Sequence, residues 1–234
     1  AGRLDRVVEG LASNEELLRR AADGKGLTRP ELAVVMATAK LALQEAIEHS
    51  PLGMDAAAEA DLLAAFPPAM QSAHASAICH HRLRNEIVAT KVANRIVNRM
   101  GLIHPFELAE EEGCTLGDVA EAFVIAEQVY DVPALWREIE TAEIGEDTRI
   151  ILFEHLAIEL RAHMADILRN SVAERSSAAA IAAYRPAVAQ LAHALDDLMP
   201  PESRRQTRAF RERLLAAGAP PSIADALVRL AELD

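Results

Sequence analysis

The sequence predicts an all-α fold, a multi-helix bundle of roughly ten to twelve helices with no sheet. Hydrophobic residues make up 51% of the chain, but aromatic residues only 3%. Alanine and leucine, both strong helix formers, supply much of the apolar content. Helix-capping patterns and proline or glycine breaks recur along the chain. No segment alternates apolar and polar residues for long, as a half-buried strand would.

Four places carry a capping pattern, in which a Ser or Thr is followed three residues later by an acid that can return a hydrogen bond to the backbone. Such a pattern marks the start of a helix. In the second of them, Pro30 suits the first helical turn, where its missing N–H would have no partner. The four pairs are Ser13 with Glu16, Thr28 with Glu31, Thr115 with Asp118, and Ser222 with Asp225.

The predicted helices follow one another closely, each ended by glycine, proline or a polar turn. One long helix is expected over residues 74–100, stopped by Gly101, and a short one begins at Pro105. An Ala-rich stretch after Ser171 is expected to be interrupted at Pro186, because a proline inside a helix lacks the N–H that the helix needs. The other expected helices cover residues 13–24, 28–48, 55–66, 115–130, 133–144 and 147–170, and further ones bounded by Pro200-Pro201 and Pro220-Pro221.

The helix predicted over residues 28–48 has an apolar stripe along one face. Its members are Leu32, Val35, Met36, Ala39, Leu43 and Ile47.

The composition shifts after Ser171, which divides the 234 residues into a main helical domain, 1–170, and a C-terminal helical extension, 171–234, a candidate subdomain. A chain of this length is expected to bury most of its apolar surface. Since it opens at Ala1-Gly2 without an initiator methionine, we expect it to be a piece of a longer protein.

The charge balance restricts the partners. With 24 basic and 36 acidic residues the net charge is −12, which disfavours nucleic acid and anionic membrane surfaces. No apolar run approaches the roughly 18 residues of a membrane span, and no signal-peptide pattern opens the chain, so a cytoplasmic location is expected. Cys79 and Cys114 lack metal-site or disulfide-framework spacing and are expected to be free thiols.

The segment from His80 to Gly101 gathers basic residues in this acidic chain. Lys91, Arg95 and Arg99 recur at i, i+4 and i+8 and would line one helix face. Such a face could dock an acidic surface of another domain or hold an anion, and the alternative is an ordinary solvated face. The candidate docking face consists of Arg84, Lys91, Asn94, Arg95, Asn98 and Arg99.

No catalytic residue, cofactor-binding residue or metal ligand is predicted. Residues 79–81, Cys-His-His, would point about 100° apart on a helix and cannot converge on one ion. His155 and His163 would lie about 12 Å apart along a helix, so with Glu159 they are expected to form a surface stripe. Residues 24–26, Gly-Lys-Gly, follow a helix rather than a strand, unlike a dinucleotide-binding loop.

Three segments together resemble one family: LTRPELAVVMATAK at residues 27–40, HHRLRNEIVATKVANRIVNRMG at residues 80–101, and EEEGCTLGDVAEAFVIAEQVYDVPALWREIE at residues 110–140. They are similar to the C-terminal helical region of the large NAD-specific glutamate dehydrogenases of bacteria. The resemblance is strong from about Leu4 to Ile144 and weaker beyond, where only general helical character continues.

The resemblance implies that this segment is a non-catalytic domain with a supporting, assembly or regulatory role. It places NAD and the oxidative deamination of L-glutamate to 2-oxoglutarate in upstream catalytic domains of the same chain. It also implies that the full-length enzyme, called the parent below, is a homo-oligomer. The alternative is a free-standing helical adaptor that binds an unrelated acidic protein. A third hypothesis is a metal site in the bundle core at His155, Glu159 and His163. The sequence lacks the paired Glu-x-x-His ligands that such bundles use.

Overall fold

The computed structural model describes residues 5–170 and 176–233. Over these residues the chain forms twelve α-helices and two 3-10 turns and contains no strand, which confirms the predicted all-α fold. The elements are α1 Asn14–Ala22, α2 Arg29–Glu48, η1 Pro51–Met54, η2 Ala56–Ala58, α3 Glu59–Leu63, α4 Pro68–Cys79, α5 Arg84–Met100, α6 His104–Glu112, α7 Leu116–Val129, α8 Val132–Thr141, α9 Glu146–Asn170, α10 Ser177–Leu198, α11 Pro201–Ala216 and α12 Pro221–Ala231.

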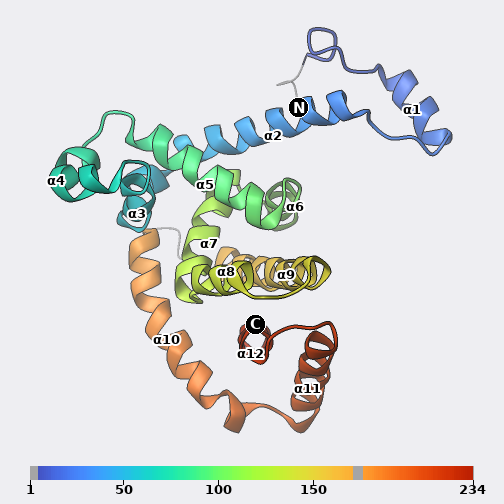
Figure 1. Ribbon diagram of the computed structural model, residues 1–234. Helices are drawn as coiled ribbons and strands as arrows, with labels where there is room; N and C mark the ends of the chain where they lie inside the picture. The colour runs from blue at the N-terminus through green and yellow to red at the C-terminus, as the bar shows by residue number, and fades with distance from the viewer. Residues whose placement is uncertain (1–4, 171–175, 234) are drawn as a thin grey trace.

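Helix α7 is the centre of the bundle. Ten of its fourteen residues are buried, and neighbouring helices pack against it on several sides: α2, α5, α6, α8, α9 and α10. Figure 1 shows α2 and α5 running together above α7, α8 and α9 beside it, and α10 descending to α11 and α12 below. Phe123, fully buried on α7, stacks against Trp136 of α8 with ring centroids 6.1 Å apart.

Capping predicted three helix starts correctly. Thr28 and Thr115 form complete capping boxes with Glu31 and Asp118, and Ser13 accepts a hydrogen bond from the Glu16 backbone N–H. The fourth prediction is wrong: α12 begins at Pro221, which places Ser222 within its first turn. Two tertiary contacts replace the expected local pair, since Ser222 donates to Glu138 and Asp225 pairs with Arg211.

The single helix predicted over residues 74–100 is also wrong. Helix α4 ends at Cys79, and α5 begins at Arg84 after a turn. Arg84 stabilises this turn, because its guanidinium donates to the carbonyl oxygens of Gly53 at 2.7 Å and Cys79 at 2.9 Å. The first of these contacts joins residues 31 positions apart, so local helix signals could not reveal it.

Pro186 does not interrupt its helix, contrary to the prediction. It lies inside α10, which is continuous from Ser177 to Leu198. Proline has a φ angle compatible with a helix, and its cost is the lost hydrogen bond to the carbonyl four residues earlier. Packing of α10 against α7 and η2 offsets that loss. The curve of α10 in Figure 1 is consistent with a proline inside it.

Helix α2 divides into two halves with different surroundings. Leu43 and Ile47 in its C-terminal half are fully buried against the bundle, whereas Leu32, Val35 and Met36 of the predicted apolar stripe are exposed. Helix α1, which precedes it, has no buried residue. The N-terminal end of the structure therefore projects from the packed body, as Figure 1 shows.

The predicted domain boundary at Ser171 falls in residues 171–175, outside the described residues. Beyond it, Ile181, Leu214 and Leu227 belong to the same hydrophobic cluster as Phe123. The division into 1–170 and 171–234 stays a prediction. Among the described residues, no helix is long and apolar enough to span a bilayer.

A candidate docking groove on helix α5

An open groove of about 840 Å³ lies where α5 faces α3, α7 and α8. Four cations and three carboxylates line it, so the net charge of the groove is positive although the net charge of the whole chain is −12. These residues are Lys91, Arg95, Arg99, Arg137, Asp61, Glu127 and Glu140. We call this feature the α5 groove.

Arg95 lies at the buried side of the groove and joins two other helices to α5. Its Nε donates to Oε2 of Glu127 on α7 at 2.9 Å, and its Nη2 donates to Oδ2 of Asp61 on α3 at 3.1 Å. The guanidinium also lies over the Phe123 ring, 5.7 Å from its centroid. Charge-assisted bonds of this kind are the stronger hydrogen bonds in proteins, and breaking a buried pair leaves an uncompensated charge.

Glu127 is the most deeply buried acid of the groove, with 2% of its surface exposed. Burial, assisted by nearby Asp61, raises the pKa of its carboxyl to about 7 against the opposing effect of Arg95. Its Oε1 has no hydrogen-bond partner among the described residues. Burial alone would lower the pKa of Arg95, but the two carboxylates more than offset this and raise it, so Arg95 stays charged.

Arg99 forms the next contact, one helical turn along α5. It pairs with Glu140 of α8, and its guanidinium lies over the Trp136 ring, 5.0 Å from the centroid. Because Trp136 is 2% exposed, the arginine covers a core side chain. Arg99, like Arg95, therefore contributes to packing within the fold.

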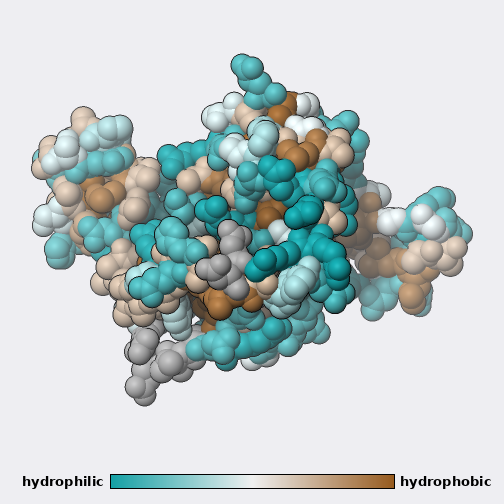
Figure 2. Space-filling model, turned by 90° about the horizontal axis from the view of Figure 1, so that it is seen from below, coloured by the Kyte–Doolittle hydropathy of each residue, from teal (hydrophilic) through white to brown (hydrophobic). Residues whose placement is uncertain are grey.

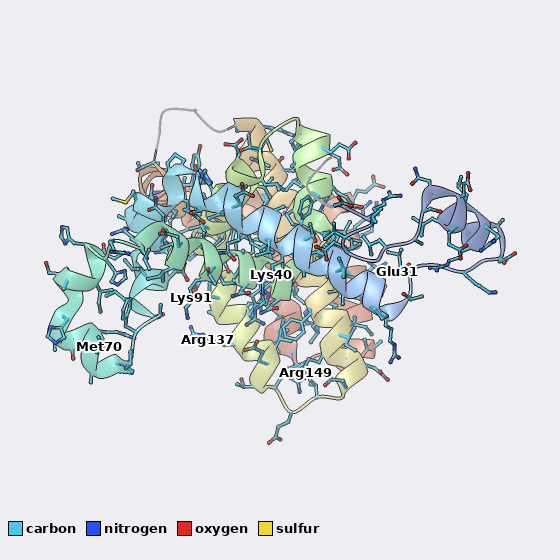
Figure 3. The ribbon with its side chains drawn as sticks, turned by 90° about the horizontal axis from the view of Figure 1, so that it is seen from above. Glu31, Lys40, Met70, Lys91, Arg137 and Arg149 are labelled. Atoms are coloured by element: carbon cyan, nitrogen blue, oxygen red, sulfur yellow. The ribbon has the colours of Figure 1, made fainter. Side chains whose placement is uncertain are left out.

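Two cations of the groove differ from these arginines. Lys91 donates to the Ala64 carbonyl at 3.3 Å and Arg137 to the Pro133 carbonyl at 3.3 Å, and within the described part of the chain neither forms an ion pair. Figure 3 shows Lys91 on α5 and Arg137 on α8 on the same side of the molecule. The groove thus presents two cations whose charge no carboxylate of the described residues neutralises.

The structure brings together four of the six residues of the predicted face: Lys91, Arg95, Asn98 and Arg99 line the α5 groove. Arg84 lies elsewhere, at the turn between α4 and α5. Asn94 is half-buried on α5 and does not line the groove.

Sequence reasoning missed the acids of the groove and Arg137. One local signal could have revealed Glu127, because it is a lone acid in the apolar run of residues 122–129, where an ionised group needs a partner. Asp61, Arg137 and Glu140 lie on short amphipathic helices with other charges nearby, and no local pattern distinguishes them.

The expected surface stripe on α9 is wrong for His163. That side chain is fully buried, stacks on Tyr130 with ring centroids 3.9 Å apart, and contacts the Leu230 carbonyl through Nε2 at 3.0 Å. It is a packing residue between α7, α9 and α12. His155 lies edge-on to Phe210, 5.0 Å between centroids. Within the described residues, no three His, Cys, Asp or Glu side chains are placed to hold a metal ion.

Comparison with known proteins decides the family. The family described as "Glutamate dehydrogenase, C-terminal" matches residues 24–234. The chain belongs to this family. The match confirms the resemblance found in the sequence and extends it past residue 144, where the sequence alone was less distinctive.

Three relatives of this chain are named NAD-specific glutamate dehydrogenase. The Pseudomonas aeruginosa protein is 33% identical over 95% of the chain, and the Halomonas elongata protein is 31% identical over all of it. The Mycobacterium tuberculosis protein is 34% identical over 68% of the chain. The chain spans 14% of the length of each of the first two relatives and 10% of the third.

Proposed function

We propose that this chain is the non-catalytic C-terminal helical domain of an NAD-dependent glutamate dehydrogenase, with a supporting role in its folding, assembly or regulation. The parent reaction is the conversion of L-glutamate, NAD and water to 2-oxoglutarate, ammonium and NADH. NAD and glutamate would bind in upstream domains of the same polypeptide, in a homo-oligomeric cytoplasmic enzyme. The small share of each relative that the chain spans supports this assignment.

The main support for the proposal is that the cations of the α5 groove fall into two kinds, those that form ion pairs within the fold and those that do not. Arg95 and Arg99 are engaged in ion pairs that join helices of this fold, so their role here is structural. Lys91 and Arg137 keep their charge open at the groove. Such an arrangement suits docking of a folded neighbour, since rigid walls present a few uncompensated charges to it.

The proposed contact of the α5 groove is an acidic surface of the upstream catalytic domains. Lys91 and Arg137 would pair with its carboxylates, and the amide of Asn98, an exposed residue of the groove, would donate or accept a hydrogen bond. Interfaces between domains of one chain are usually modest in area and polar, which fits a charged groove of this size.

The first test is whether this chain catalyses anything by itself. We expect residues 1–234 alone to produce no glutamate-dependent NADH, while the full-length parent does so under the same conditions. Turnover by residues 1–234 alone would contradict the non-catalytic role.

The second test reverses the open charges in the full-length parent, with Lys91→Glu and Arg137→Glu together. We expect loss of assembly or a lower kcat, because like charges would face each other across the contact. Arg205→Glu with Arg208→Glu, two exposed residues of α11, is the matched control and should leave both unchanged. If the groove variant behaves like the control, the groove does not dock the upstream domains, and binding of an unrelated acidic protein would favour the adaptor function.

A further inference from the structure

The N-terminal end of the structure carries an apolar surface that no part of the described chain covers. Leu32, Val35 and Met36 recur at i, i+3 and i+4, so they share one face of α2. Their exposed fractions are 47%, 36% and 45%, whereas Leu43 on the same helix is fully buried. Leu27, 40% exposed, lies just before the helix. We call these four residues the α2 ridge.

Helix α1 is held beside this ridge by polar contacts rather than by apolar packing. The Glu31 carboxylate, 8% exposed, accepts hydrogen bonds from the Thr28 N–H and hydroxyl, both at 2.8 Å, and from Arg20 of α1 at 2.8 Å. It also accepts the Ala12 N–H, at 3.3 Å. Figure 3 shows Glu31 at the start of α2, where the chain turns towards α1.

These contacts fix the connection between α1 and α2, which we call the Glu31 joint. Arg20 completes it by donating also to Glu16 at 2.8 Å, so one guanidinium connects two carboxylates. The hydrogen bonds from Thr28 and the charge of Arg20 lower the pKa of Glu31 to about 2, so the carboxylate is ionised at neutral pH. A helix fixed in this way, yet with no buried residue, holds its place without burying apolar surface.

Exposed apolar patches on a folded chain commonly mark protein contacts. In the space-filling view of Figure 2, hydrophobic residues gather on the right-hand lobe, which α1 and the start of α2 form, and on the neck that joins it to the body. The ridge lies on α2 and Leu27, away from the α5 groove between α3, α5, α7 and α8. It is therefore a second surface, and it differs in chemistry because it is apolar.

The family boundary indicates what covers the ridge. The match to the C-terminal family begins at residue 24, so α1 lies before it and α2 lies within it. The family's description places this region at the C-terminus of glutamate dehydrogenases, and the chain spans 14% of the first two relatives, so most of such a polypeptide would join it on the α1 side. A covalent link of this kind holds a neighbour at an effective concentration on the order of millimolar, which favours it over a second copy of the chain.

We infer that the α2 ridge packs against the upstream part of the same polypeptide, with α1 and its Glu31 joint setting the angle at which that part leaves. This inference rests on the proposed function, because it takes the upstream domains as the partner. It adds a specific apolar contact that the α5 groove does not supply.

The test is photo-crosslinking in the full-length parent. A benzoylphenylalanine placed at Met36 should crosslink, within one polypeptide, to a peptide upstream of this region. The matched control is the same probe at Leu41, which is 62% exposed on the same helix but about 140° around it from Met36. A Met36 crosslink between two subunits would show that a second copy covers the ridge, and no Met36 crosslink above the Leu41 background would show that nothing does. Either result would overturn the inference.

A second measurement uses Lys25, an exposed trypsin site between two glycines in the joint. In the full-length parent, Leu32→Asp with Met36→Asp should speed cleavage at Lys25 by ~10-fold or more, because the joint would open once the ridge loses its cover. Leu41→Asp should cleave like the wild type, and equal rates for all three proteins would contradict the inference. If the ridge fails both tests while deletion of this region still abolishes assembly, the proposed function stands and the ridge assignment alone is wrong.

Discussion

The Nε atom of Arg95 on α5 lies 2.9 Å from Oε2 of Glu127 on α7, a carboxylate with 2% of its surface exposed. Asp61 of α3 binds the same guanidinium, so one arginine connects three helices. The contact is also the buried wall of the α5 groove. Stability and the proposed docking surface therefore share one side chain.

Replacing Arg95 should destabilise the chain strongly. At pH 9, above the Glu127 pKa of about 7, Arg95→Met keeps the volume of the side chain but leaves an ionised Glu127 buried without its cation, and we expect a loss of about 3–5 kcal/mol in the free energy of unfolding. Denaturant titration measures it. Arg211→Met is the control: in its ion pair with Asp225 the two side chains are 38% and 50% exposed, so the loss should stay below about 1 kcal/mol. Adding Glu127→Gln to Arg95→Met should recover part of the loss, and no recovery would contradict the buried-charge explanation.

Glu127 should also give the chain a pH dependence of stability. Its folded pKa of about 7 lies above the ordinary 4.5, so the folded state binds the proton more tightly. The stabilisation is complete below pH 4.5 and is lost as pH rises to 7. Relative to Glu127→Gln, the wild type should lose about 3 kcal/mol as pH rises from 4.5 through 7. A constant difference between the two proteins across that range would show that Glu127 has an ordinary pKa.

Glu31 should act in the opposite direction and in a lower pH range. Its folded pKa of about 2 lies below 4.5, so its contribution is present above pH 4.5 and is lost as pH falls towards 2. An NMR titration of the Glu31 carboxyl should give a midpoint near 2, and Glu31→Gln should speed amide exchange at Ala12 and Thr28, whose N–H groups it accepts. A midpoint near 4.5 would mean that the joint between α1 and α2 is not formed in solution.

Pro186→Ala should stabilise the chain. The substitution restores an N–H inside α10 and removes the clash of the proline ring, while the unfolded chain gains some freedom, which leaves a net gain of about 1–2 kcal/mol in the free energy of unfolding. Pro201→Ala tests the reason, because Pro201 begins α11, where its N–H is not needed. A gain at Pro201 equal to that at Pro186 would argue against the lost hydrogen bond as the cause.

Local chemistry made much of this fold predictable. The pairs Thr28–Glu31 and Thr115–Asp118 mark their helix starts because each hydrogen bond joins residues three apart. The break between α4 and α5 was not predictable in this way, since Arg84 holds the turn by binding Gly53. Ser222 failed as a cap for the same reason, because its hydroxyl binds Glu138 of a distant helix.

The candidate site was predictable to a similar extent. The i, i+4, i+8 spacing placed Lys91, Arg95 and Arg99 on one face, and all three line the α5 groove. Which of them keeps an open charge depends on acids contributed by α3, α7 and α8. Helix periodicity fixes the face of a side chain but says nothing of the partner opposite it.

The most direct test of the supporting role is to add residues 1–234 back to a full-length parent from which they have been deleted. Glutamate-dependent NADH production and particle size are measured before and after the addition. Our account predicts that the deletion lowers activity or assembly and that the added chain restores it in proportion to its concentration. A deleted parent that keeps full activity and its native size would contradict the account.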